Sequence, residues 1–413
     1  MDRKTFLDVL SPEGEVALQA AAAIEHREVD FLLHFQVLSR RFPPDLAKAA
    51  LEITIQRVKG REKFPFAERL YFTREALEQA SSYEVSTYQA ERYRPFPLVA
   101  DLGCSAGGDS LALAEVASVI GIDRDPLRLA MAQANLRALN LDERASFIRA
   151  DLTEQLPFSH ILGNGGYRNT LAGTGSPCGV ALFFDPARRA GERRAFSVHH
   201  YQPPLSIIKD WLPSFPALGV KISPGVDLKE LKDYDAEVEF ISLTGELKEA
   251  VLWFGPLKTA HRRATLLPGP HTLIPGGDSR LSISNPLAYL YEPDPAILRA
   301  GLVRDLGALL NMAQIDADIA YLTSDRLVET PFARAWAVEE WFPFGLKRLR
   351  AYLHQRGVGQ VVVKKRGSPL QPEALIHDLR LRGDQERVVF LTHVQGQPVV
   401  IIGCELGEKD GQS

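Results

Sequence analysis

The sequence predicts an α/β protein: a doubly wound parallel sheet, preceded by a helical region and followed by a small α+β region. Three observations lead to this prediction. Short apolar runs alternate with helical segments from Pro95 to about residue 255. Several of these runs end in an aspartate. A cluster of glycines separates the first run from the helical segment after it, which is typical of a strand-to-helix turn at a ligand site.

The composition is that of a globular protein with two or three domains: 413 residues, of which 45% are hydrophobic and 24% charged. A net charge of −4 excludes a uniformly basic nucleic-acid-binding protein, so any basic surface must be local. Cys104, Cys178 and Cys404 lie far apart and show no zinc spacing, so we expect no metal. The sequence shows no leader or membrane-spanning stretch, and a reducing cytoplasm is the expected location.

Residues 1–90 are predicted to be helical. Ser11 has the position of an N-cap, and Pro12 that of the first helical turn. Pro43 and Pro44 interrupt the helical apolar pattern, which then resumes.

Residues 91–260 are predicted to form the doubly wound sheet. The expected strands are the apolar runs at 97–103, 118–123, 145–151, 180–186 and 218–225. Two further runs, at 236–243 and 249–254, predict a closing antiparallel hairpin. A Pro/Gly-rich stretch at about 265–281 is the predicted domain boundary. Beyond it we expect a small module over 280–328 and a second one over 329–406.

The stretch VADLGCSAGGDS predicts a ligand-binding loop, because glycines at a strand-to-helix turn let the backbone approach a ligand. Asp123 ends the next run and can accept two hydrogen bonds from ribose hydroxyls. The GxxxGG spacing differs from the dinucleotide pattern GxGxxG and favours S-adenosylmethionine (SAM). The candidate SAM-binding residues are Asp101, Gly103, Ser105, Gly107, Asp123, Arg124 and Asp151. Glycines that only permit tight turns are the alternative.

This part of the chain, roughly 95–255, resembles the class I SAM-dependent methyltransferases. Asp101-Leu102-Gly103-Cys104-Ser105-Ala106-Gly107 matches their first motif, and Gly121-Ile122-Asp123 matches their second. The resemblance implies a Rossmann-like methyltransferase sheet and SAM as the methyl donor. It does not identify the acceptor, because this fold serves many substrates.

The stretch FFDPARR ends the predicted fourth strand. Asp185-Pro186-Ala187-Arg188 resembles the DPPR sequence of RNA methyltransferases that methylate base carbons, with Ala187 in place of the second proline. The resemblance implies catalytic roles for Asp185, Pro186 and Arg188. Arg188 and Arg189 are candidates for binding phosphate. The alternative is that both arginines form salt bridges to neighbouring carboxylates.

Two departures from that pattern bear on the chemistry. No cysteine follows Asp185 in this domain, although carbon methylation of pyrimidines usually needs a nucleophilic one. The aromatic residue of the related NPPY motif is also absent. We therefore expect direct displacement of the methyl group from sulfur. Lys221 follows the fifth predicted strand and is a candidate for the substrate pocket; an exposed or ion-paired lysine is the alternative.

The C-terminal region carries the local positive charge. Lys364, Lys365 and Arg366 follow a strand-like run and are candidates for contact with RNA phosphates, with a solvated charged face as the alternative. The stretch from about Thr330 to Cys404 resembles the THUMP-like domain of a bacterial methyltransferase subgroup, on PFARAWAVEEWFPF, VVVKKRGSPLQPEAL and LRLRGDQERVVFLTHVQGQPVVII. Residues 280–325 resemble the small ferredoxin-like module of those proteins, and the N-terminal helices resemble their lead-in. The resemblance implies RNA, such as tRNA or rRNA, as the partner.

The favoured hypothesis is a SAM-dependent RNA methyltransferase of the cytoplasm. A methyltransferase acting on a small molecule or a protein is the first alternative. A catalytically silent RNA-binding protein that retains SAM is the second. A dehydrogenase is the least favoured, because of the glycine spacing. The oligomeric state is not predicted.

Overall fold

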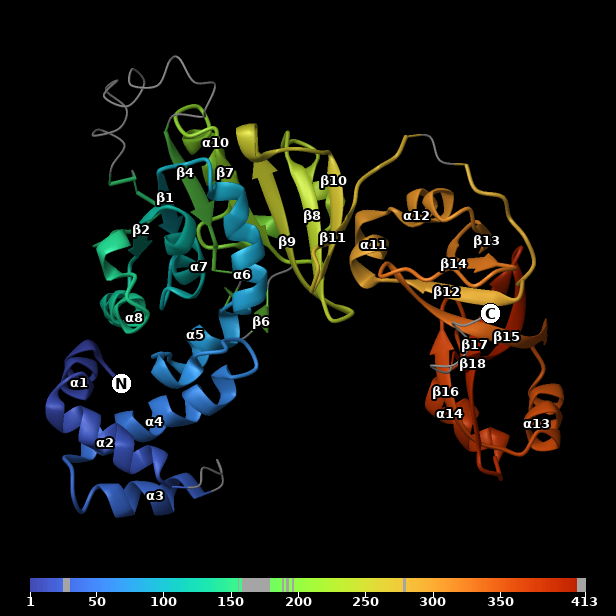
Figure 1. Cartoon of the computed structure of the whole chain (residues 1–413), viewed down its shortest axis with the longest axis horizontal. Coiled ribbons are helices and arrows are strands. Elements are labelled where there is room, and N and C mark those ends of the chain that lie inside the picture. The colour runs from blue at the N-terminus through green and yellow to red at the C-terminus, as the bar shows by residue number, and fades with distance from the viewer. Residues whose placement is uncertain are drawn as a thin grey trace. The chain divides into compact units, whose positions relative to one another are not determined.

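The computed structural model describes residues 1–24, 30–154, 156–157, 179–187, 189–190, 193–194, 197–277 and 280–406. The chain forms two compact units (Figure 1). Unit 1 contains Met1–Glu239 and Lys248–His261, and unit 2 contains Phe240–Leu247 and Arg262–Ser413. The two units are described separately below.

Helices fill the N-terminal part of unit 1, as predicted. Ser11 caps the second helix by accepting a hydrogen bond from the Gly14 N–H at 3.1 Å, and Pro12 is its first residue. The fourth helix begins at Pro44, where proline costs no intrahelical hydrogen bond. The helices are α1 Arg3–Val9, α2 Pro12–Ala22, α3 Phe31–Leu38, α4 Pro44–Gly60, α5 Arg74–Gln79 and α6 Tyr83–Ala90.

The predicted doubly wound sheet is confirmed. In unit 1 its strands lie in the order β3-β2-β1-β4-β7-β9 (Figure 1). The first five are mutually parallel, and β9, the second strand of the predicted closing hairpin, pairs antiparallel with β7. The strands are β1 Leu98–Leu102, β2 Ser118–Asp123, β3 Ala145–Arg149, β4 Val180–Phe184, β7 Leu218–Ile222, β8 Glu237–Leu243 and β9 Glu246–Phe254; the short pair β5 Arg189–Ala190 and β6 Arg193–Arg194 lies outside this sheet. The helices between them are α7 Gly108–Val116, α8 Pro126–Ala138 and α10 Ile208–Trp211.

The centre of this sheet is buried on both faces. All five residues of β4 and of β7 are buried, which is why β4 is a continuous apolar run and β7 is apolar except for Lys221. Parallel strands bring their carboxyl ends to one edge. The polar residues that end β2 and follow β4 therefore meet the glycine loop after β1 at that edge.

Buried polar contacts join the N-terminal helices to the sheet. Arg92, just after α6, donates to Glu237 and Glu239 at 3.0 Å and lies 4.6 Å from the Trp253 ring centroid. The neighbouring Tyr93 hydroxyl donates to the Leu182 carbonyl at 3.0 Å. These bonds satisfy polar groups inside the fold, so the helices and the sheet form one hydrogen-bonded body.

Unit 2 contains a seven-stranded sheet in the order β13-β14-β12-β15-β18-β17-β16. Both predicted C-terminal modules contribute strands to it. The stretch predicted as a domain boundary lies within this unit, where β10 and β11 pair antiparallel. The strands are β10 Arg262–Leu267, β11 His271–Leu273, β12 Tyr289–Pro293, β13 Ala313–Asp316, β14 Ile319–Ser324, β15 Ala333–Pro343, β16 Val358–Lys365, β17 Gln385–Val394 and β18 Gln397–Glu405. The helices are α11 Pro295–Ala300, α12 Val303–Leu309, α13 Leu346–Gln355 and α14 Pro372–Leu379.

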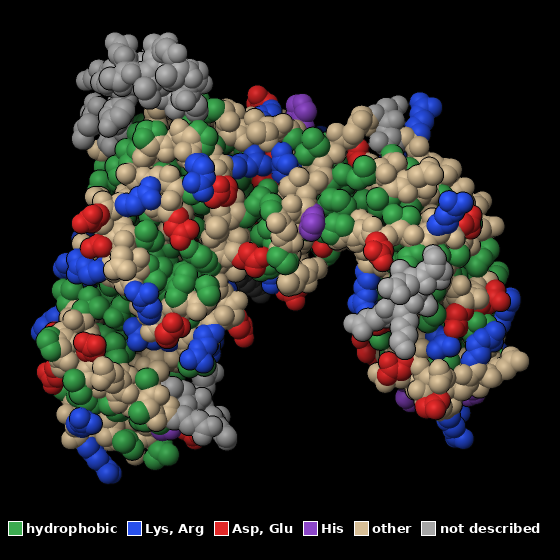
Figure 2. All heavy atoms as spheres, in the orientation of Figure 1, with side chains coloured by type: hydrophobic (Ala, Val, Ile, Leu, Met, Phe, Trp, Pro, Cys, Tyr) green, Lys and Arg blue, Asp and Glu red, His purple; other side chains and the backbone are tan. Residues whose placement is uncertain are grey.

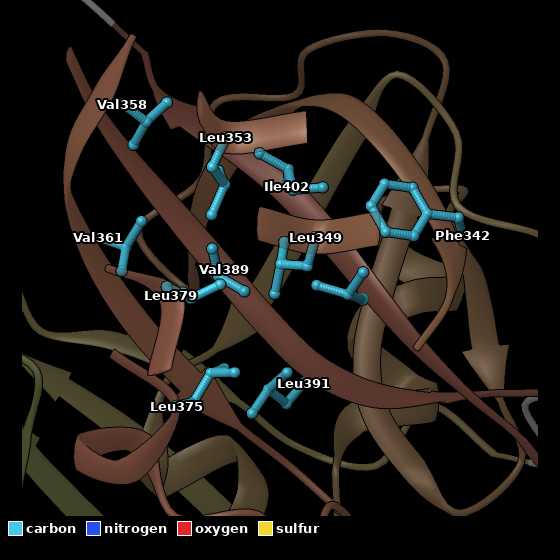
Figure 3. Close-up of a cluster of buried hydrophobic side chains, with 11 residues drawn as sticks. Phe342, Leu349, Leu353, Val358, Val361, Leu375, Leu379, Val389, Leu391 and Ile402 are labelled. Atoms are coloured by element: carbon cyan, nitrogen blue, oxygen red, sulfur yellow. The ribbon is translucent and has the colours of Figure 1, made fainter. Parts of the chain in front are cut away.

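Two helices cover one face of this sheet. Leu349 and Leu353 of α13, and Leu375 and Leu379 of α14, point at strand residues such as Val389 (Figure 3). All five side chains are buried in one apolar cluster. The i, i+4 spacing within each helix places both leucines on one face, which is the face that packs on the sheet.

No helix within the described ranges is long and apolar enough to cross a bilayer. The same residues contain no group of three His, Cys, Asp or Glu side chains placed to hold a metal ion.

Candidate active site

A cavity of about 390 Å³ opens at the carboxyl edge of the sheet in unit 1. Its size is within the range of about 300–1,000 Å³ for small-molecule sites. The glycine loop after β1, the ends of β2 and β4, the segment after β3 and helix α5 all contribute to its wall. The residues with polar side chains in the wall are Glu78, Gln79, Ser105, Asp109, Asp123, Arg124, Arg128, Asp151, Thr153, Asp185 and Gln202.

The loop after β1 adopts a shape that only glycine permits. Gly103 has φ +83°, and a Cβ there would lie 2.6 Å from the backbone oxygen of Asp185. Gly107 has φ +80°, and a Cβ there would lie 3.0 Å from the Cβ of Ala132. Gly103 lines the cavity directly, whereas Gly107 lets α7 begin close against α8. The structure thus places both predicted glycines in the loop for distinct steric reasons.

Asp123 lies at the end of β2 with both carboxylate oxygens fixed. One oxygen accepts the Ser105 N–H at 3.0 Å, and the other accepts the Asp125 N–H at 2.8 Å. Each oxygen retains a second acceptor position, so the carboxylate can still receive two hydroxyl donors from the cavity. Ser105 lies beside it with φ +51°, and its buried hydroxyl finds no hydrogen-bond partner among the described residues. A buried hydroxyl without a partner at a cavity wall is a group that a ligand can satisfy.

Arg124 follows β2 and Asp151 follows β3, whereas Asp185 follows β4, so β1 lies between them in the strand order β4-β1-β2-β3. Asp151 accepts hydrogen bonds from the Thr153 N–H at 2.9 Å and the Thr153 hydroxyl at 2.7 Å. These bonds lower the pKa of Asp151, so it is a carboxylate that is ready to accept further hydrogen bonds at neutral pH.

Asp101 does not line the cavity, in contrast with the other predicted acids. It is still inside β1, 1% exposed, and accepts a hydrogen bond from the Ser110 hydroxyl at the start of α7. Burial, reinforced by the charge of Asp109, raises the pKa of Asp101 to about 8. Its contact with Ser110 joins β1 to α7, the two elements on either side of the glycine loop.

The raised pKa of Asp101 predicts a pH-dependent stability. Because the pKa of Asp101 is higher in the folded protein, the unfolded chain releases this proton at lower pH than the folded protein does. The contribution of Asp101 to the free energy of unfolding therefore declines from about pH 4 to about pH 8. Asp101→Asn keeps a hydrogen-bonding side chain without the ionisation. We expect the free energy of unfolding of the variant, relative to the parent, to rise with pH across this window. Urea unfolding of both proteins at several pH values measures it. The exposed Asp210→Asn is the control, and parallel curves for Asp101→Asn and the parent would refute the prediction.

Asp185 and Pro186 lie at the cavity directly after β4. The Asp185 N–H donates to the Leu102 carbonyl at 3.0 Å, which ties this turn to the end of β1. The Ala187 N–H donates to the Gln202 carbonyl at 3.2 Å, and the Gln202 N–H returns a bond at 3.0 Å. A second proline at position 187 would lack the N–H that makes the first of these bonds, which is a physical reason for alanine there.

Lys221 is buried beneath the cavity and is not part of its wall. Its side chain is 0% exposed, and its ammonium lies 2.7 Å from Asp185 and 3.0 Å from Asp109, two acids that do line the cavity. It also donates to the Ser81 hydroxyl at 2.8 Å and lies 3.8 Å from Glu249. Of the two alternatives that the sequence leaves open, the structure therefore favours an ion-paired lysine over one that faces a substrate.

Several site residues were not predicted from the sequence. Asp109 lies in the first turn of α7, next to the predicted glycines. Glu249 is a lone acid in the otherwise apolar inner part of β9, and it could have been flagged as a buried charge. The wall formed by α5 carried no local signal. Lys63 holds the end of that helix by donating to the carbonyls of Leu77, Glu78 and Ala80 at 2.6–3.1 Å.

The remaining predicted residues fall in three places. Arg188 and the side chain of Arg189 lie outside the described residues, as does Cys178. Cys104 is a buried free thiol whose pKa is raised by that burial, which disfavours the thiolate needed for nucleophilic attack. In unit 2, Lys364 and Arg366 both pair with Glu292, while the exposed Lys365 donates to Gln371 at 3.1 Å.

The cavity has the electrostatic character of a site for a cation. Five acids and two arginines line it: Glu78, Asp109, Asp123, Asp151, Asp185, Arg124 and Arg128. SAM carries a sulfonium and an ammonium and no phosphate, and so matches this excess of carboxylates. A dinucleotide would bring two phosphate charges into an acidic wall. The partnerless Ser105 hydroxyl and the free acceptor positions of Asp123 complete a set of groups that fits SAM.

Comparisons with known proteins agree with this geometry. Two uncharacterised SAM-dependent methyltransferases of Mycobacterium tuberculosis, from strains CDC 1551 and H37Rv, are each 34% identical to the chain over 328 residues. The match covers 78% of this chain and 84% of each relative. The crystal structure of a candidate methyltransferase from Porphyromonas gingivalis W83 has the same fold, with a TM-score of 0.76 at 22% identity. It covers 98% of this chain and 100% of the other.

Three family profiles match separate parts of the chain. Residues 99–161 match a methyltransferase domain, and residues 333–405 match a THUMP domain-like family. Residues 2–59 match a domain of unknown function. The identity to the mycobacterial relatives, the domain match and the acidic cavity at the glycine loop agree with one another. The chain belongs to the SAM-dependent methyltransferases, with SAM as its cofactor and a THUMP-like domain at its C-terminal end.

Proposed function

We propose that this methyltransferase acts on RNA, with tRNA or rRNA as the acceptor, by direct displacement of the methyl group. The observation that carries the proposal is the THUMP-like match over residues 333–405, joined in one chain to a SAM-binding cavity. We place the reaction in the cytoplasm, where free thiols such as those of Cys104 and Cys404 stay reduced.

We infer that Asp123, Ser105, Gly103, Arg124 and Asp151 hold the cofactor. Asp123 would accept the ribose hydroxyls, and Asp151, at the far end of the wall, would meet the adenine amino group. Asp101 and Gly107 would act indirectly: Asp101 accepts a hydrogen bond from Ser110 of α7, and Gly107 lets the loop lie close to α8. Bound SAM supplies an electrophilic methyl group on a positively charged sulfur.

Asp185 is the residue that we assign to the acceptor. Its carboxylate would accept a hydrogen bond from the N–H or O–H of the acceptor and orient the lone pair toward the methyl carbon. As the new bond to carbon forms, the carbon–sulfur bond breaks and sulfur keeps the electron pair. The acceptor proton passes to Asp185 or to solvent. Pro186 fixes the turn that presents Asp185, and Arg188 and Arg189 would contact a nearby phosphate.

The surface of the protein supports local contacts with RNA. Figure 2 shows Lys and Arg side chains interspersed with Asp and Glu on the face that it presents, so phosphate binding depends on individual groups. Within the THUMP-like region the exposed cations are Arg334, Lys347, Arg348, Arg356, Lys365, Arg380 and Arg382.

A labelling experiment tests the proposed acceptor. The protein is incubated with SAM carrying a radiolabelled methyl group and with total RNA from cells that lack it. We expect label that nuclease releases and protease does not, and digestion to nucleosides would then name the modified position. Label that protease releases, or that appears in small molecules, would refute RNA as the acceptor. SAM bound without transfer to any extract would favour a silent RNA-binding protein.

The basic cluster after β16 gives a second, independent prediction. Lys364 and Arg366 share Glu292, so Lys365 is the member most available to phosphate. We expect Lys365→Ala to weaken RNA binding and to lower the slope of log affinity against log salt by about 0.7–0.9, the value for one phosphate contact. Titrations with RNA at several salt concentrations measure the slope. The exposed Lys232→Ala in unit 1 controls for the loss of one charge, and an unaltered slope for Lys365→Ala would make the cluster a solvated face.

A further inference from the structure

The ammonium of Lys221 lies at the centre of a buried charge network. Three acids surround it, and they come from three different elements: Asp109 from α7, Asp185 after β4 and Glu249 from β9. The Lys221 side chain is 0% exposed, and those of Asp109, Asp185 and Glu249 are 13%, 21% and 8% exposed. A buried ammonium is stable only when it is paired and hydrogen-bonded, so these contacts are what holds Lys221 in place.

The acids divide into two kinds by their position. Asp109 and Asp185 both line the cavity and both contact Lys221, at 3.0 and 2.7 Å. Glu249 does not line the cavity. It accepts hydrogen bonds from the Ser81 hydroxyl and from the Gln89 amide, the latter at 2.9 Å. Lys221 therefore connects the two acids of the cavity wall with Glu249, a third acid that is buried outside the wall.

We propose that Lys221 is a positioning residue, which holds the carboxylates of Asp109 and Asp185 together at the cavity wall so that they can receive the positive charge of SAM. Two carboxylates at one wall repel each other and tend to take up a proton. A shared ammonium between them removes that tendency. The formal charge of Lys221 with its three acids is −2, which leaves the wall negative toward a cationic ligand.

Two other charged groups, Asp101 and Lys63, lie near Lys221. The charge of Lys221 lowers the pKa of Asp101 on β1, but burial outweighs it and raises that pKa to about 8. Asp101 is therefore largely protonated at neutral pH. Lys63, after α4, lies near both Lys221 and Glu249, but its ammonium is engaged with the three carbonyls at the end of α5.

Two substitutions with opposite effects test the proposal. Lys221→Met removes the cation that offsets the repulsion between Asp109 and Asp185, so SAM binding is expected to be lost at higher pH. Glu249→Gln removes an acid that competes for Lys221, so SAM binding is expected to persist to lower pH. The second change fits the existing space: Ser81 can still donate to the amide oxygen. The Gln89 Oε1, which has no hydrogen-bond partner among the described residues, can turn to accept from the new amide nitrogen.

The measurement is the dissociation constant of SAM by calorimetry from about pH 3 to about pH 9, with no acceptor present. We expect the midpoint of the loss of binding at low pH to rise by about 1–3 pH units in Lys221→Met, the range for removing an opposite charge, and to fall in Glu249→Gln. The ionisation of SAM itself affects the parent and every variant equally. Lys232→Met, which removes an exposed lysine, is the control. If Lys221→Met does not fold, Glu249→Gln decides. An unshifted midpoint in folded Glu249→Gln, or in folded Lys221→Met, would make the network purely stabilising and overturn the proposal. Because no RNA is used, this result is independent of the proposed acceptor.

Discussion

Replacing Asp185 with alanine is expected to lower the rate of methyl transfer by about 10²–10⁴-fold, the contribution typical of a positioned group that orients the acceptor and accepts its proton. The structure gives the reason. The side chain lies at the cavity wall, its backbone is fixed to Leu102, and its carboxylate is held 2.7 Å from the Lys221 ammonium. The effect is measured as single-turnover transfer of labelled methyl to the acceptor that the labelling experiment identifies.

The same variant should bind SAM more weakly, because Asp185 is also one of the two carboxylates that face the positive charge of SAM. A lost contact with a charged group costs about 1.5–3 kcal/mol, so we expect the dissociation constant to rise by about 10–10²-fold, and the transfer rate is therefore compared at saturating SAM. Asp210→Ala removes an exposed acid from the same unit and serves as the control. Transfer by Asp185→Ala at more than a tenth of the parent rate would show that another group orients the acceptor.

Replacing Asp123 with alanine is expected to have the largest effect on the cofactor. Two hydrogen bonds from ribose hydroxyls to a carboxylate are worth about 1.5–3 kcal/mol each, which corresponds to a SAM affinity about 10²–10⁴-fold weaker. The loss also frees the Ser105 and Asp125 N–H groups, which Asp123 now fixes at 3.0 and 2.8 Å. Calorimetric titration with SAM measures the change.

A matched variant separates the site from general charge. Asp142→Ala removes an exposed carboxylate that pairs with Arg137 at 3.6 Å, away from the cavity, and should bind SAM as the parent does. Equal affinities for Asp123→Ala and the parent would remove Asp123 from the cofactor site and would favour the cavity end near Asp151 instead.

The parts of the site that the sequence predicts are those made by neighbours in the chain. Gly103, Ser105 and Gly107 belong to one loop, and Asp123 follows the next strand, so local spacing locates them. Asp185 is found because a predicted strand precedes it and a proline turn follows it. The doubly wound sheet is predicted for the same reason, since each strand–helix–strand step is written in consecutive residues.

The Lys221 network could not be predicted, because its contacts are remote in sequence. Lys221 is 112 residues from Asp109 and 140 from Ser81, and Ser81 is 168 from Glu249. No periodic pattern links such pairs; only the folded sheet brings them together. Asp101 shows a related limit. It resembles a strand-terminal acid, but the structure retains it within β1 beneath α7, where neighbouring elements bury it.

The contacts between the N-terminal helices and the sheet restrict how this enzyme can be recombined. Ser81 and Gln89 donate to Glu249, and the Tyr88 hydroxyl donates to Glu239 at 2.6 Å. A methyltransferase cassette cut at residue 91 would therefore leave these two buried carboxylates without those donors. A chimera that joins this activity to a different C-terminal module must therefore carry the chain from Lys63 onward. The smallest segment that could be moved between proteins is therefore larger than the Rossmann-like core, because moving the core alone would leave buried charges unpaired and destabilise the fold.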